Sequence, residues 1–275
     1  MFVPLAFLTK WKDRATRAAT GRLETAVPLT DDQVRATWLA ASWLIGYPDD
    51  EVVDRLELLA RLIDTLPDPI AADLRQTLTG LRDADLQTIR SEYVETFDTR
   101  RRGCLYLTYF TNGDTRKRGM ALLEIKQTYQ EAGLDVSDDE LPDHLAYVLE
   151  FGAAHDLHRG VSLLLTNRAG LELLRIHLQD TGSPWAGVLR AVCATLPPLD
   201  GDDVKAVERL ITEGVEEEHV GLTGYGHEDG SADMPPADMS PYAIDAAGPP
   251  ASVFAPPQTG GRAFIPLSQV KGRRS

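Results

Sequence analysis

The chain has 275 residues, 43% of them hydrophobic, and a formal net charge of −14. Its pI near 4.8 argues against nucleic acid as the main partner, because binding to phosphates requires a positive field. No run of about 18 apolar residues occurs, so we expect no membrane span. The two cysteines, Cys104 and Cys193, show no metal-binding spacing, which predicts reduced thiols in a cytoplasmic protein.

The composition divides the chain into three parts. Residues 1–29 place apolar side chains before basic ones, the reverse of a secretory signal, and predict a flexible leader. Residues 217–275 hold 8 of the 17 prolines and 8 of the 22 glycines. This segment cannot bury enough apolar surface to offset its chain entropy, so we expect a disordered tail. Residues 30–216 between them predict one all-α helical-bundle domain of about nine to ten helices.

Helical periodicity begins after Thr30. Thr30 and Gln33 have the form of a capping box, and Val34, Trp38, Ala41 and Ile45 then recur on one helix face. Similar stripes, bounded by glycine, proline or capping residues, continue along the chain. We expect helices over about 31–45, 50–66, 69–80, 84–97, 104–110, 115–132, 143–155, 157–166, 168–180, 184–196 and 202–215.

The segment CLYLTYF (104–110) has the composition of a strand. A lone strand cannot satisfy its backbone, and no convincing partner strand is visible in the sequence. We therefore interpret it as a short buried helix. A second capping-box pattern, SDDE (137–140), precedes the helix expected to start at Asp143.

No common catalytic motif is present: the sequence has no P-loop, dinucleotide fingerprint, HExxH or GxSxG pattern. His144, His155 and His158 suggest a metal site only weakly, because no acidic pair is placed to complete it. Cys104 lies near Arg102 but has no evident base partner. A metal- or thiol-dependent enzyme using His144 and Cys104 is the less favoured alternative.

Three stretches carry the functional signal: YVETFD (93–98), GDTRKRG (113–119) and ELPDHLAYVLEF (140–151). Together, and in this order, they resemble the delta-subunit assembly chaperones of respiratory nitrate reductase (the NarJ type). These belong to the wider TorD/DmsD-like family of chaperones for molybdenum oxidoreductases. The resemblance runs from about Trp38 to Val215.

The resemblance implies an all-helical protein without enzymatic activity or a permanently bound cofactor. Such a chaperone binds the N-terminal segment of the apo catalytic (alpha) subunit, which we expect in complex with the beta subunit. It keeps that subunit competent for insertion of molybdenum bis(molybdopterin guanine dinucleotide) and delays docking to the membrane. A chaperone for a different molybdoenzyme stays open as an alternative.

A groove for an apolar and basic client peptide needs aliphatic and aromatic walls with an acidic rim. Candidates for both, together with His144, lie in or directly before the first and third stretches. The walls are Tyr93, Phe97, Leu145, Tyr147 and Leu149, and the rim is Glu92, Glu95, Asp98, Asp143 and Glu150. The leader has the apolar-then-basic pattern of such a peptide and is a candidate to occupy the groove in cis.

Residues 98–119 hold six basic side chains against two aspartates, in a chain that is otherwise strongly acidic. We favour pairing of these basic residues with nearby carboxylates that fixes the helix layout. Contact of Arg116 and Arg118 with an acidic client surface or with cofactor phosphates is the alternative.

Overall fold

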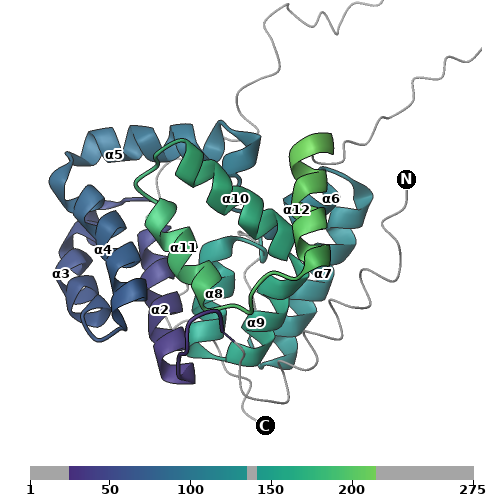
Figure 1. Ribbon diagram of the computed structural model, residues 1–275, viewed down its shortest axis with the longest axis horizontal. Coiled ribbons are helices and arrows are strands. Elements are labelled where there is room, and N and C mark those ends of the chain that lie inside the picture. Colours follow the sequence, from purple (N-terminus) through teal and green to yellow (C-terminus); the bar gives the residue numbers. More distant parts are fainter. Residues whose placement is uncertain (1–24, 135–140, 215–275) are drawn as a thin grey trace, which may run out of the picture. The chain divides into compact units, whose positions relative to one another are not determined.

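The computed structural model describes residues 25–134 and 141–214, and within these ranges the chain is all-helical, as predicted (Figure 1). The described ranges contain eleven α-helices, one for each helix range expected from the sequence and slightly more than the overall estimate of nine to ten, with one π-helical and one 3₁₀ segment between α5 and α6. Their bounds are α2 Asp31–Leu44, α3 Asp50–Ile63, α4 Asp68–Asp83, α5 Leu86–Tyr93, η1 Val94–Asp98, η2 Arg101–Gly103, α6 Leu107–Asn112, α7 Arg116–Glu131, α8 Leu145–Ala154, α9 Leu157–Thr166, α10 Arg168–Asp180, α11 Ala186–Ala194 and α12 Gly201–Glu213.

Helix α2 begins at the predicted capping box. The Thr30 hydroxyl accepts from the Gln33 amide at 3.2 Å, and the Gln33 side chain accepts from the Thr30 amide at 2.9 Å. The predicted stripe from Val34 to Ile45 is fully buried, and α2 packs against α8 and α11. The Trp38 indole N–H donates to the Thr195 hydroxyl at 2.7 Å, which ties α2 to the end of α11.

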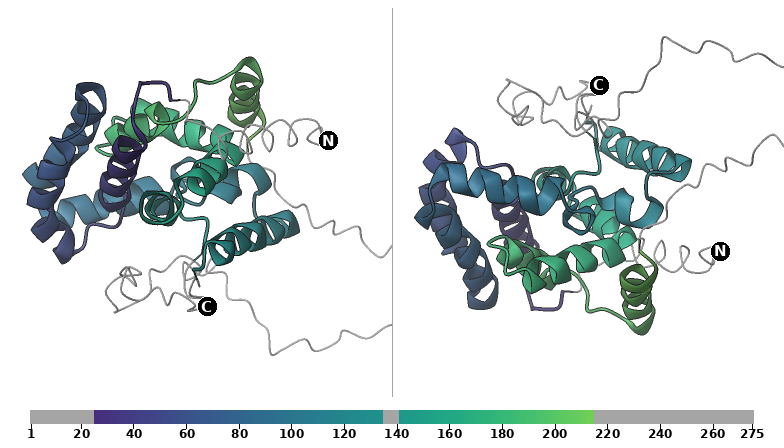
Figure 2. Two further views of the ribbon diagram at one scale, coloured as in Figure 1. Left: turned by 90° about the horizontal axis from the view of Figure 1, so that it is seen from below. Right: turned by 90° about the horizontal axis from the view of Figure 1, so that it is seen from above.

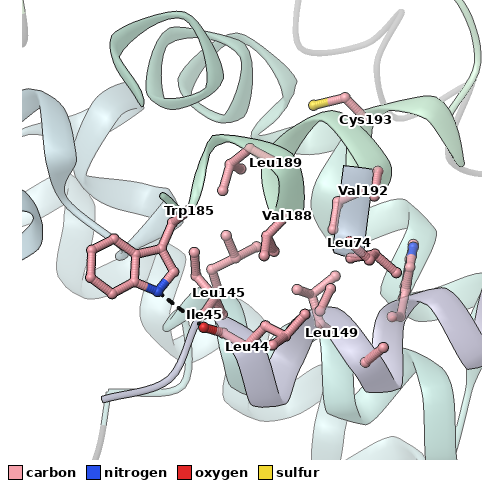
Figure 3. Close-up of a cluster of buried hydrophobic side chains, with 14 of the residues drawn as sticks. Leu44, Ile45, Leu74, Leu145, Leu149, Trp185, Val188, Leu189, Val192 and Cys193 are labelled. Carbon is pink, nitrogen blue, oxygen red and sulfur yellow. Dashed lines mark hydrogen bonds between the residues drawn. The ribbon is translucent and has the colours of Figure 1, made fainter. Parts of the chain in front are cut away.

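The centre of the core lies around Trp185, just before α11 (Figure 3). Its indole N–H donates to the Leu44 carbonyl at 3.1 Å, so the end of α2 is fixed to the start of α11. Leu145 and Leu149 of α8 and Val188 of α11 are fully buried in the same cluster. Four helices that are distant in sequence therefore share one apolar core, α4 being the fourth through Leu74.

Helix α7 lies at the opposite end of the described helices from α3 and α4 (Figure 2). It buries only Ile125 and Tyr129, which pack with Phe151 of α8 in a small second cluster. Met120 and Leu123 in its first half are 63% and 59% exposed. No helix in the described ranges is long and apolar enough to cross a membrane.

Several expected boundaries differ or lie outside the described residues. The helix expected over 84–97 ends at Tyr93 and continues as the π-helical turn η1. Residues 25–29, assigned to the leader, lie against the end of α11, where the Ala26 amide donates to the Leu196 carbonyl at 2.9 Å. The rest of the leader, the SDDE pattern and the tail from 215 onward are outside the described residues.

Candidate functional site

Residues 104–110, which precede the second motif stretch, meet the third stretch at a short backbone pairing. The Leu145 amide donates to the Leu105 carbonyl at 2.8 Å, and the Leu107 amide donates to the Asp143 carbonyl at 3.0 Å. Tyr106 and His144 form an isolated antiparallel bridge between these bonds. The first residues of the strand-like segment 104–110 therefore do pair with another segment, the residues just before α8. The helix expected in this segment forms from Leu107 onward, as α6.

Asp143 is fully buried and does not lie on an acidic rim. One carboxylate oxygen, Oδ2, accepts from the Thr108 amide at 3.1 Å and from the Thr108 hydroxyl at 2.5 Å. The other oxygen, Oδ1, is buried without a hydrogen-bond partner in the described part of the chain. Asp143 therefore caps the start of α6, and His144 caps α8 by accepting from the Ala146 amide through Nδ1 at 3.3 Å.

Arg118 covers the aromatic residues of this pairing. Its guanidinium carbon lies 5.7 Å from the ring centroid of Tyr106 and 5.9 Å from that of Tyr109, within the range of a cation–π contact. It also forms an ion pair with Asp114 at 3.0 Å. Arg118 thus fixes the start of α7 on α6, which is the structural role favoured for the basic stretch.

The other basic residues of the stretch divide between two roles. Arg100 forms an ion pair with Glu95 at 2.6 Å, which joins η1 to the start of η2. Arg116 is exposed and has no ion pair among the described residues. Arg101 and Arg102 are exposed as well. The stretch is therefore partly a structural element and partly a basic surface.

Three half-exposed rings form a continuous row beside Arg118. The ring of His144 lies 5.3 Å from that of Tyr106 and 5.3 Å from that of Tyr147. Glu150, also half-exposed, follows Tyr147 by three residues on the same side of α8. We call Tyr106, His144, Tyr147 and Glu150 the aromatic face. Sequence reasoning missed Tyr106, although its place between two basic clusters was visible.

The remaining wall residues belong to the core. Tyr93 is 5% exposed and its hydroxyl donates to the Ile45 carbonyl at 3.1 Å. Its ring packs on Phe97 and on Trp185 at centroid distances of 4.7 and 5.5 Å. Leu145 and Leu149 are fully buried. Apolar neighbours on several elements surround these side chains, which are part of the core in this structure. Their contact with a client peptide stays a prediction.

Of the expected acidic rim, Glu92, Glu95 and Asp98 are exposed on α5 and η1. They precede the 3₁₀ segment η2, which packs closely on η1: a Cβ on Gly103 would lie 1.8 Å from the Thr96 carbonyl oxygen.

Both cysteines are poor nucleophiles at neutral pH. Burial raises the pKa of the Cys104 thiol to about 11 and that of the Cys193 thiol to about 12. A thiol with such a pKa is almost fully protonated near pH 7. Among the residues that the structure describes, no group of three or more His, Cys, Asp or Glu side chains could hold a metal ion.

The comparisons with known proteins agree with the motif order. A family model described as the nitrate reductase delta subunit matches residues 63–191. The probable nitrate reductase molybdenum cofactor assembly chaperone NarJ of Bacillus subtilis is 31% identical over 171 residues, covering 61% of this chain and 90% of the relative. The chain belongs to the nitrate reductase delta subunit family.

Two further relatives extend this result. The nitrate reductase molybdenum cofactor assembly chaperone NarJ of Escherichia coli K12 is 30% identical over 175 residues, covering 62% of this chain and 74% of the relative. The nitrate reductase-like protein NarX of Mycobacterium tuberculosis H37Rv is 40% identical over 172 residues, again 62% of this chain. The match spans only 26% of that longer protein. The resemblance to NarJ-type chaperones is thereby confirmed at the level of the family.

The aromatic face falls inside the range matched by the delta-subunit model. That range begins at the last residue of α3 and ends within α11. It includes Tyr106, Arg118, Asp143, His144 and Tyr147. Helix α12 and residues 25–62 lie outside it.

Proposed function

We propose that this chain is a cytoplasmic assembly chaperone of nitrate reductase, without catalytic activity of its own. It binds the N-terminal segment of the apo catalytic subunit, in complex with the beta subunit, and keeps it open for insertion of molybdenum bis(molybdopterin guanine dinucleotide). It also delays docking to the membrane. The names of its relatives support nitrate reductase as the client enzyme, in preference to another molybdoenzyme.

The observation that carries the proposal is the aromatic face. Tyr106, His144 and Tyr147 present half-exposed rings in contact with one another, and the backbone beneath them is fixed by the 105–107 to 143–145 pairing. Rigid aromatic side chains give a large contact area at low entropic cost. The apolar residues of a client peptide would pack on these rings, and a basic residue would meet Glu150.

Cofactor loading of the client is the test. The nitrate reductase catalytic subunit is produced, with and without this chain, in a host that lacks its own delta-subunit chaperone. The molybdenum content per catalytic subunit is then measured by mass spectrometry. We expect several-fold more molybdenum with the wild-type chain and little gain with Tyr147→Ala. Equal molybdenum content with and without the chain would overturn the proposal.

Arg116 and Arg118 are expected to differ in this assay. Arg116 is exposed, so we propose that it contacts an acidic client surface or the phosphates of the incoming cofactor. Arg116→Glu should then lower molybdenum loading and leave thermal unfolding unchanged. Arg118→Glu should lower the unfolding temperature, since it loses the Asp114 pair and both ring contacts. Normal loading with Arg116→Glu would remove Arg116 from the site.

A further inference from the structure

Helix α12 leaves part of its apolar surface uncovered. It packs against α10 (Figure 1) and buries Val207. Val204 and Ile211, two helical turns apart and therefore on one side, are 42% and 43% exposed. We call Val204, Glu208 and Ile211 the α12 flank, since Glu208 lies between the two apolar side chains and is also exposed.

The surroundings of this flank are acidic. From Asp200 to Glu213 the chain carries five carboxylates against Lys205 and Arg209, a net charge of −3. Neither end of the helix adds a basic residue. An occupant of the α12 flank should therefore combine apolar side chains with a positive charge.

The leader of this chain has that composition. Residues 1–24 begin with an apolar and aromatic run, MFVPLAFL, and continue with five basic side chains against Asp13 and Glu24, a net charge of +3. Trp11 lies between Lys10 and Lys12, so apolar and basic groups adjoin. Charge and apolar character of the leader thus both match the α12 flank.

The leader also enters the described structure next to α12. The Ala26 and Val27 amides donate to the carbonyls of Leu196 and Ala194 at 2.9 and 3.4 Å. Helix α12 begins five residues after Leu196, a separation of at most about 17 Å. Twenty-four residues extend over about 36 Å even as a continuous helix. The thirteen residues of α12 cover only about 20 Å, so the leader is long enough to lie along the whole of α12.

We propose that residues 1–24 dock in cis on the α12 flank. Their apolar residues cover Val204 and Ile211, and their basic residues face Glu208, which lies on the same side of the helix. The other exposed apolar pair, Met120 and Leu123 on α7, lies beside exposed basic residues at the start of that helix, which would repel a positive leader. The docked leader holds α12 on α10 from the side that the described helices leave open.

Zero-length crosslinking of the full chain tests this contact. A carbodiimide joins lysine amines to neighbouring carboxylates, and an equal mixture of light and heavy isotope-labelled protein separates links within a chain from links between chains. We expect intrachain links from Lys10 or Lys12 to Glu208. Their yield should fall at least about fivefold in Val204→Ser/Ile211→Ser, because the apolar contact is lost. The matched variant Met120→Ser/Leu123→Ser should keep the wild-type yield.

Hydrogen exchange gives a second readout that does not depend on the α12 variant. The leader variant Phe7→Ser/Leu8→Ser should speed the exchange of α12 amides and leave α10 unchanged. Links from the leader mainly to Glu150, links mainly between chains, or no leader links at all would each overturn the proposal. The first of these results would place the leader on the aromatic face.

Discussion

The carboxylate of Asp143 joins two segments that lie 35 residues apart in the chain. Removing it leaves the Thr108 amide and hydroxyl without their acceptor at the buried start of α6. We expect Asp143→Ala to lower the free energy of unfolding by about 2 kcal/mol, by analogy with lost helix caps and with buried donors left unsatisfied. Urea denaturation followed by circular dichroism measures this difference.

Asp114→Ala is the matched control, because Asp114 is exposed and its ion pair with the mostly buried Arg118 is open to solvent on the Asp114 side. Exposed ion pairs contribute at most about 1 kcal/mol. Thr108→Val should weaken the fold less than Asp143→Ala, and the double variant should be less destabilised than the sum of the two. An Asp143→Ala effect no larger than that of Asp114→Ala would show that the cap contributes little.

A histidine on α10 makes stability dependent on pH. Burial, together with the charges of Arg100 and Arg102, holds the pKa of His177 below its usual value, while Asp180 acts in the opposite direction. Its Nε2 atom is buried without a hydrogen-bond partner in the described ranges. The unfolded chain therefore binds a proton at a higher pH than the folded chain does, and stability falls as the pH drops below about 6.5.

We expect His177→Gln to flatten this loss of stability between about pH 7 and pH 5, since it removes one group whose pKa rises on unfolding. Urea denaturation of both proteins at a series of pH values gives the slope directly. His155 contributes in the same direction, because burial also lowers its pKa, so a residual slope should persist. An unchanged slope in His177→Gln would refute the assignment.

At the scale of elements, α8 and α9 cross at two glycines over the Trp38 ring. A Cβ on Gly152 would lie 2.3 Å from the Trp38 ring, and one on Gly160 would lie 2.7 Å from the Gly152 Cα. We expect Gly152→Ala and Gly160→Ala each to destabilise the fold by about 1–3 kcal/mol through overpacking. Thermal unfolding by calorimetry would show the loss.

Gly119 supplies the control for these two substitutions. It lies inside α7, and a Cβ there would meet no atom within 4 Å. Gly119→Ala should stabilise the fold by up to about 1 kcal/mol, because glycine is the poorer helix former. If Gly160→Ala behaved like Gly119→Ala, the close crossing of α8 and α9 would be wrong.

The sequence predicted helices better than it predicted their ends. Periodic apolar residues located the helices of the described ranges other than α6, and the Thr30–Gln33 capping box forms as expected. Helix α6 was expected only because no partner strand was visible for residues 104–110. The turn from α5 into η1 has no such signal, because a π-helical segment keeps nearly the same side-chain pattern. The pairing of Leu105 with Leu145 was also missed, since a bridge of two hydrogen bonds needs no recognisable strand.

At the scale of the molecule, the order of the motifs identified the family. It did not show which motif residues are buried in the core and which lie at the surface. Tyr93 and Phe97 lie four residues apart on one predicted face, a pattern that serves a groove and a core equally well. The core contact with Trp185, 92 residues later in the chain, decides between them. His144 stays partly exposed because Asp143 and Leu145, on either side of it in the chain, take the buried positions. Tyr147 is also partly exposed.

The central claim is that the aromatic face binds the N-terminal segment of the catalytic subunit. Its most direct test is calorimetric titration of the full chain with a synthetic peptide of the first thirty or so residues of the host's nitrate reductase catalytic subunit. Tyr147→Ala tests the face, and Leu58→Ala, which removes a 56% exposed side chain on α3, is the control.

We expect micromolar or tighter binding that Tyr147→Ala weakens by about tenfold or more, as for a central aromatic contact, and that Leu58→Ala leaves unchanged. Binding that survives Tyr147→Ala at full strength would place the peptide elsewhere on the chain. No binding by the folded wild-type protein would contradict the central claim itself.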